Sequence, residues 1–172
     1  MEMKNKKQTP KDFKLPRYTE IPNTGLYLEQ VSQYMNDILS PLGCATITSS
    51  MISNYVKKGL ITSPVKKLYY ADQISYLFAV SIMKLVLPME NIQKLFDMQK
   101  EVYSTPVAYD YFCTELENVL QYVYEEKEQM DEIGSSSTQI KTMLRNTIIS
   151  AAHIIHLNEC FKNLDSQKLN IE

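Results

Sequence analysis

The sequence contains few of the residues that build tight turns and disulfide frameworks. Of its 172 residues only four are glycine, three are cysteine and two are histidine, and tryptophan is absent. Scarce glycine argues against a β-sandwich or β-barrel, which needs many tight turns. The widely spaced Cys44, Cys113 and Cys160 make neither a disulfide framework nor a CxxC motif, so we expect them to be buried apolar side chains.

The sequence also lacks a long apolar run. Its most apolar stretch, residues 74–87, includes Lys84 and is shorter than the roughly 20 residues that a membrane-spanning helix needs. The N-terminus is basic but has no apolar segment, which argues against a secretory signal. We therefore expect a cytoplasmic protein without a membrane partner.

Charge is distributed unevenly along the chain, although the net charge is only −2. Residues 1–67 hold ten Lys or Arg against five Asp or Glu, and the remaining residues hold eight against fifteen. The asymmetry favours an N-terminal half that faces a polyanion. Much of it comes from residues 1–17, however, so a Lys-rich tail alone would produce a similar asymmetry.

Apolar residues recur at helical spacing along most of the chain, which predicts a mostly α fold. We expect helices at about 26–39, 51–58, 72–87, from Pro88 onward, 107–132 and 139–161. Asn23 or Thr24 would cap the first, Thr48 or Ser49 the second and Asp72 the third. The segment TSPVKKLYY, residues 62–70, reads as a short hairpin or wing.

The order of these elements resembles the N-terminal domain of MerR-type regulators over about residues 26–98. The matching residues are Ile52, Tyr55, Gly59, Leu60, Pro64, Tyr70, Asp72, Ile74, Met89, Glu90 and Ile92. Ser53 and Asn54 stand where that family usually has Arg and Tyr. The resemblance implies a MerR-like winged helix-turn-helix at 21–104, preceded by a flexible basic arm or a strap at 1–20 and followed by a C-terminal helical region at 105–172.

Residues 18–160 also resemble a family of short Bacillota proteins classified as domain of unknown function 1836, whose core is MerR-like. The segments that carry this resemblance are IPNTGLYLEQVSQYMNDIL and YDYFCTELE. It implies the architecture and supplies no activity.

The MerR-like resemblance implies that the helix near residues 51–58 enters the major groove of DNA. Short polar side chains would reach bases, because Asn can pair with adenine and Ser with several bases. Lysines on the helix and the wing would contact phosphates. The expected DNA-binding residues are Ser49, Ser50, Ser53, Asn54, Tyr55, Lys57, Lys58, Lys66, Lys67 and Tyr69. Tyr55 is equally compatible with a core position, and Lys57 and Lys58 with simple stabilisation of a helix C-terminus.

Other residue clusters favour structural roles. His153, His156 and Cys160 share one helical face, but His153 and Cys160 are too far apart to share one zinc ion, so we expect no metal site. No nucleophile motif or phosphate loop is present, and we expect neither an enzyme nor a cofactor. The tyrosines at 103, 109, 111, 122 and 124 pack in the core or line a ligand pocket.

We therefore expect a DNA-binding transcriptional regulator. Its partners would be double-stranded DNA, a second copy of the chain in a homodimer, and a small-molecule effector. The alternative is a protein-protein interaction module with a MerR-like fold that does not bind DNA, which the absent arginines and weak charge favour.

Overall fold

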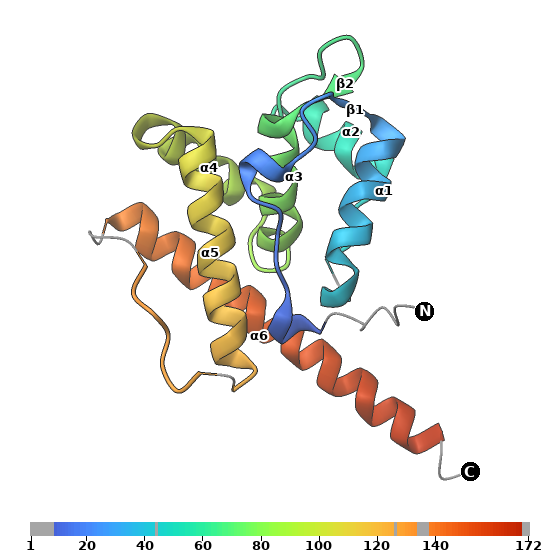
Figure 1. Ribbon diagram of the computed structural model, residues 1–172, viewed down its shortest axis with the longest axis vertical. Helices are drawn as coiled ribbons and strands as arrows, with labels where there is room; N and C mark the ends of the chain where they lie inside the picture. The colour runs from blue at the N-terminus through green and yellow to red at the C-terminus, as the bar shows by residue number, and fades with distance from the viewer. Residues whose placement is uncertain (1–8, 44, 126, 134–137, 170–172) are drawn as a thin grey trace, which may run out of the picture.

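Helices account for most of the chain in the computed structural model, which describes residues 9–43, 45–125, 127–133 and 138–169 (Figure 1). The α-helices in these ranges are α1 Leu28–Leu39, α2 Ser49–Lys57, α3 Ala71–Met83, α4 Met89–Val102, α5 Thr105–Val123 and α6 Gln139–Leu169. The short elements are strands β1 Leu26–Tyr27 and β2 Leu68–Tyr69 and the 3-10 turns η1 Pro10–Asp12, η2 Tyr18–Glu20 and η3 Ser40–Leu42. The expectation of a mostly α fold is confirmed.

The N-terminal segment from residue 9 to 20 forms a strap across α5. Phe13 and Leu15 are buried in the core, and both η1 and η2 contact α5. This part of the chain is thus an ordered strap rather than a flexible arm, because two apolar side chains anchor it. Residues 1–8 of the expected arm lie outside the described residues.

Helices α1 and α2 pack against each other. Val31 and Met35 on α1 and Ile52 on α2 are fully buried, as their helical spacing predicts. A polar clamp sets the turn between the helices. The side chain of Asn36 donates to the carbonyl of Ile47 at 2.6 Å and accepts from its amide at 2.9 Å.

The two strands join the start of α1 to the segment before α3. They pair antiparallel, with Leu26 opposite Tyr69. A bridge between Val65 and Leu68 closes a two-residue turn before β2. The expected hairpin is therefore present, and its second strand also pairs with β1.

Helix α3 is the central helix, as its apolar residues on both sides predict. Within Gln73–Met83, all residues except Tyr76 are buried. Helices α5 and α6 both contact it. A helix enclosed in this way connects the N-terminal elements to the C-terminal ones.

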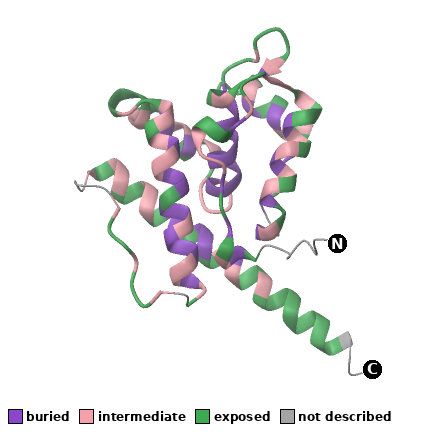
Figure 2. Cartoon of the chain, in the orientation of Figure 1, coloured by how far each residue is buried: buried purple, intermediate pink, exposed green. Residues whose placement is uncertain are grey.

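Helix α6 is packed over one half and exposed over the other. Ile148, Ala151 and Ile155 are buried, and α5 packs along this half. Beyond residue 156 almost all of its side chains are exposed (Figure 2). Glu159 still accepts from the hydroxyl of Tyr124 at 2.6 Å, and past this contact the helix extends away from the other elements (Figure 1).

The core crosses the boundary expected between residues 104 and 105. One hydrophobic cluster contains Phe13 of the strap, Ile52 of α2, Phe78 of α3, Leu116 of α5 and Ile148 of α6. The two expected regions therefore share a core. Among the described residues, no helix has the length and apolar character needed to cross a membrane.

Several expected helix ends and caps are wrong. Helix α5 ends at Val123 instead of 132, where Glu125 adopts a φ of 61°. Helix α6 continues to Leu169 instead of 161. The caps of α1 and α3 are Tyr27 and Tyr70, whose backbone amides donate to glutamine side chains three residues later.

Candidate nucleic-acid interface

The exposed face of α2 is polar and carries one lysine. Ser50, Ser53, Asn54 and Lys57 are exposed, and their spacing of three, four and seven residues puts them on one side of the helix. Ile52 and Tyr55, on the opposite side, are buried. Ser49, at the first position, is half-buried. The structure thus brings four of the predicted DNA-binding residues onto one open surface.

Both ends of α2 are fixed by hydrogen bonds. The Thr48 hydroxyl accepts from the amide of Met51 at 3.2 Å, so the predicted N-cap is confirmed. At the other end Gly59 has a φ of 75°. The amide of Leu60 donates to the carbonyl of Tyr55 at 3.0 Å, as in a Schellman motif. Lys57 and Lys58 are therefore held in the last turn, both exposed to solvent.

Lys66 and Lys67 form the tip of the hairpin. Their φ angles are 50° and 67°, in the left-handed region, and the amides and carbonyls of Val65 and Leu68 bond reciprocally at 2.9 Å. A two-residue turn with both φ angles positive usually contains Asn-Gly, since other side chains are strained there. Both lysine side chains are exposed. The hairpin therefore presents two adjacent cations at a strained position.

Tyr55 and Tyr69 lie in the core. Only 5% and 4% of their surfaces are exposed, and burial raises the pKa of both phenols. The DNA contacts expected from these two tyrosines are therefore not available in this fold. Their aromatic rings instead anchor α2 and β2 in the hydrophobic core.

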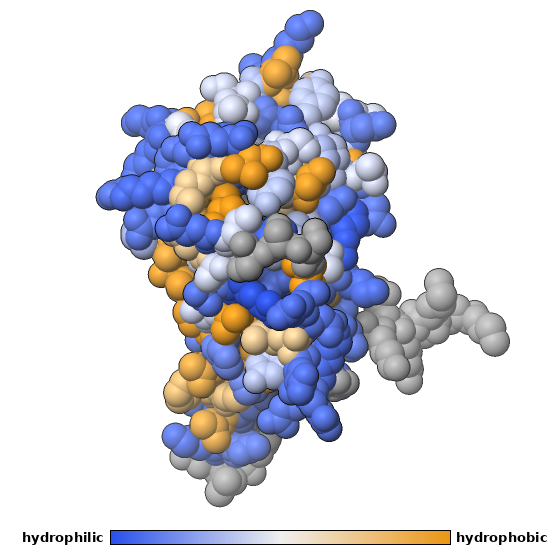
Figure 3. Space-filling view, turned by 90° about the vertical axis from the view of Figure 1, so that its left-hand side faces the viewer, coloured by the Kyte–Doolittle hydropathy of each residue, from blue (hydrophilic) through white to orange (hydrophobic). Residues whose placement is uncertain are grey.

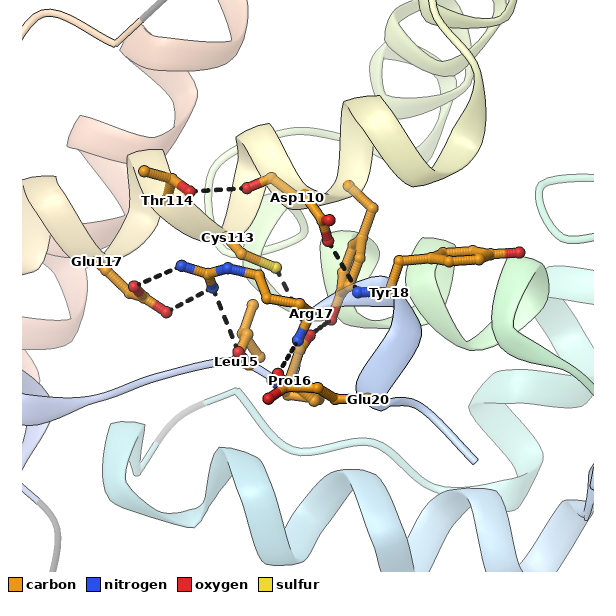
Figure 4. A network of polar contacts seen from close by, with 10 residues as sticks. Leu15, Pro16, Arg17, Tyr18, Glu20, Asp110, Cys113, Thr114 and Glu117 are labelled. Carbon is orange, nitrogen blue, oxygen red and sulfur yellow. Dashed lines mark hydrogen bonds and ion pairs between the residues drawn. The ribbon is translucent and has the colours of Figure 1, made fainter. Parts of the chain in front are cut away.

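Arg17 of the strap is paired within the protein (Figure 4). Its guanidinium donates to both carboxylate oxygens of Glu117 on α5, at 2.7 and 2.9 Å, and this hydrogen bonding raises the pKa of Arg17. Nearby, the amide of Tyr18 donates to Asp110 at 2.8 Å, and burial raises the pKa of Cys113 to about 12. Part of the N-terminal charge excess therefore stabilises the fold.

The histidine face of α6 does not assemble a metal site. The structure places His156 against the ring of Tyr124, with 4.8 Å between centroids, and 3.7 Å from the sulfur of Cys160. Across the described residues, His, Cys, Asp and Glu form no metal-binding cluster of three or more. Cys113 is buried as expected, whereas Cys160 is exposed and the expectation for it is wrong. Cys44 lies outside the described residues.

Comparison with known proteins places the chain in a family. A family model described as "Domain of unknown function (DUF1836)" matches residues 16–112, more than half of the chain. The chain belongs to the DUF1836 family. The DUF1836 match begins in the strap and ends within α5, so it includes α1, α2, the hairpin, α3 and α4. No curated protein and no solved structure matches the chain significantly.

Two glutamines that position the candidate interface were missed. Gln73 accepts from the amide of Tyr70 at 2.8 Å and donates to the carbonyl of Ser63 at 2.9 Å, which ties the hairpin to α3. Gln30 accepts from the amide of Tyr27 at the start of α1. The available signal was a glutamine three residues after the cap, the capping-box spacing.

Proposed function

We propose that the chain is a DNA-binding transcriptional regulator of MerR-like type. In this proposal α2 enters the major groove and the hairpin at 65–68 acts as the wing. The observation that carries it is the open polar face of α2, accompanied by a hairpin whose tip is two exposed lysines. Such a pair of elements suits DNA, because a helix reads base edges while cations outside the groove contact phosphates.

The composition of the α2 face supports base recognition. Asn54 is suited to a bidentate contact with adenine, and Ser50 and Ser53 are short enough to let the helix approach the groove closely. Lys57 and Lys58, at the C-terminal end of α2, would contact the phosphate backbone of the DNA. The absence of arginine on this face predicts modest affinity, since bidentate arginine contacts to guanine are missing.

The hairpin tip supports the same function. Two lysines in left-handed conformations cost about 1–2 kcal/mol each compared with residues that accept this geometry. Strain of this kind persists where function requires particular side chains. Phosphate binding would supply such a requirement.

A homodimer is part of this proposal, because helix-turn-helix proteins commonly bind two half-sites. The projecting half of α6 offers an apolar stripe of Leu157, Phe161 and Leu164, whose exposed fractions are 53%, 63% and 52%. The spacing of four and three residues is that of a coiled-coil seam. Glu159, Lys162, Asp165 and Lys168 balance in charge, so a second copy of the helix would meet no net repulsion.

Selection of binding sites from random duplex DNA, followed by fluorescence anisotropy at several salt concentrations, tests the proposal. Replacing Lys57, Lys58, Lys66 and Lys67 with alanine is expected to abolish binding at moderate salt. It should reduce the salt slope by about three to four, if each lysine contacts one phosphate. The matched control replaces Lys14, Lys94, Lys100 and Lys127, which lie outside α2, the hairpin and α6, and loses the same charge. Equal binding by the two variants would refute the proposal.

The second candidate is a protein-protein interaction module, which the exposed stripe on α6 and the net charge of −2 favour. Affinity capture after nuclease treatment distinguishes it from the first. One stoichiometric protein partner without enriched DNA would favour the interaction module. Enrichment of defined DNA fragments before nuclease treatment would favour the regulator.

A further inference from the structure

A partly enclosed cavity of about 150 Å³ lies between α3, α4, α5 and α6. Tyr103, Tyr109 and Tyr111 line it, so three of the five tyrosines considered from the sequence are at the cavity. Tyr124 instead packs against His156. Figure 3 faces the side formed by α4 and the first part of α6, where apolar side chains are exposed among polar ones.

The volume and the walls of the cavity limit what it can hold. An apolar cavity of about this volume takes up a molecule the size of benzene. Tyr76 and Phe96 meet edge to face on one side, with 4.7 Å between their ring centroids, and Phe112 contributes another ring. Aromatic walls favour a flat ligand, because offset and edge contacts between rings are attractive.

Three residues that line the cavity, Tyr76, Gln99 and Tyr103, are joined by hydrogen bonds. The hydroxyl of Tyr76 donates to the side-chain oxygen of Gln99 at 2.7 Å, and the Gln99 amide donates to the carbonyl of Tyr103 at 2.7 Å. A polar ligand would have to break these bonds to be satisfied. The interior therefore selects an apolar group.

One cation lies at the α5–α6 end of the cavity. Lys141 is among the lining residues, and its ammonium lies 5.3 Å from the ring centroid of Tyr111 and 5.9 Å from that of Tyr103. Cation–π contacts on two rings keep this charge at the cavity. One turn later, Arg145 is engaged with the buried carboxylate of Glu115. Lys141 is thus placed to meet an anionic group attached to a ring inside.

We propose that this cavity binds a monocyclic aromatic carboxylate, with the ring between α3, α4 and α5 and the carboxylate at Lys141. Binding at this site does not depend on DNA contact. Because α3 also carries the bond from Gln73 to the hairpin segment, the ligand would contact the helix that supports the candidate DNA-binding surface.

Calorimetric titration of the full chain with phenylacetate, and with neutral 2-phenylacetamide, tests the proposal. We expect saturable binding of phenylacetate at one site per chain. Lys141→Gln should weaken phenylacetate about tenfold or more, since a charge-assisted hydrogen bond is lost, and should change phenylacetamide affinity by less than about twofold. Lys100→Gln is the matched control. The ammonium of Lys100 lies 5.2 Å from the ring centroid of Tyr76, but Lys100 does not line the cavity.

Filling the cavity provides a second, independent test. Ala108 on α5 lines the cavity and is only half-buried, so Ala108→Leu is expected to fold and to abolish binding of both compounds. Circular dichroism and thermal unfolding establish that the variant is folded, and should it fail to fold, the Lys141 comparison decides the outcome. No saturable phenylacetate binding up to about 10 mM would overturn the proposal. Equal loss of both compounds in Lys141→Gln, or unchanged binding in a folded Ala108→Leu, would also overturn it.

Discussion

Arg17 and Glu117, 100 residues apart in the sequence, form a bidentate ion pair between the strap and α5. The guanidinium nitrogens lie 2.7 and 2.9 Å from the two carboxylate oxygens. Glu117 is largely buried and Arg17 about one-third exposed. Because both oxygens are satisfied by one planar group, this pair fixes the direction of the strap as well as its position.

Arg17→Met is expected to lower the free energy of unfolding by about 1–2 kcal/mol, since it leaves the Glu117 carboxylate without its partner. Chemical unfolding in urea measures the change. Lys14→Met is the matched control on the same strap, where the side chain is exposed and the expected change is within about 0.5 kcal/mol. Similar losses in the two variants would show that the pair contributes no specific stability.

Glu115 is expected to make the stability of the protein depend on pH. Its side chain is fully buried, with Arg145 Nε 2.9 Å from one carboxylate oxygen, yet neither oxygen accepts a well-aligned hydrogen bond. Burial raises the pKa of Glu115, and Arg145 partly opposes this. The folded protein therefore holds this proton more tightly than the unfolded chain. The resulting stability is complete below the unfolded pKa of 4.5 and is lost as pH rises through the folded pKa.

Glu115→Gln removes this titration. We expect the stability of the variant relative to the wild type to increase as the pH is raised from 4.5 toward 7, measured by urea unfolding at each pH. Glu128→Gln, at an exposed position, should follow the wild type throughout. A constant difference between Glu115→Gln and the wild type across this range would contradict the predicted pKa shift.

The helical fold was predictable because apolar spacing along α1, α3 and α6 is dictated by local sequence. The Asn36 clamp, the position of the strap on α5 and the Arg17 pair were not predictable, because each depends on residues that meet only after folding. The candidate interface likewise has some features that could be predicted from the sequence and others that could not. Exposed Ser53 and Asn54 follow from the helical period, whereas the burial of Tyr69 depends on the pairing of β2 with β1.

Replacing Lys66 and Lys67 with Asn and Gly is expected to raise stability by about 2–4 kcal/mol, because Asn-Gly accepts positive φ at both positions and relieves about 1–2 kcal/mol at each. If the hairpin contacts phosphates, the same variant should bind DNA more weakly. Replacing both lysines with arginine keeps the positive charge and the backbone strain, so the stability and the DNA affinity of this variant should match those of the wild type. Thermal unfolding and anisotropy measure the two effects. A gain in stability with unchanged DNA affinity would exclude the hairpin tip from the interface.

The cysteines are expected to differ in reactivity. Burial raises the pKa of Cys113 to about 12, and its sulfur lies 3.8 Å from the carbonyl of Pro16 under the strap, whereas Cys160 is exposed. Iodoacetamide at neutral pH should therefore label Cys160 in the native protein and Cys113 only after unfolding. Mass spectrometry of the separate peptides measures both sites. Early labelling of Cys113 would show that the strap opens readily.

Phe161→Glu is expected to prevent formation of the proposed dimer, because it places a charge in the middle of the exposed apolar stripe on α6. Sedimentation velocity over a range of concentrations measures the change, and circular dichroism should show the helix content retained. Asn163→Glu adds the same charge at an exposed position outside the stripe and should leave the dimer intact. If the wild type is already monomeric at the highest concentration, or if the two variants dissociate equally, the stripe is not the dimer contact. DNA binding by such a chain would then require half-site recognition by a single copy.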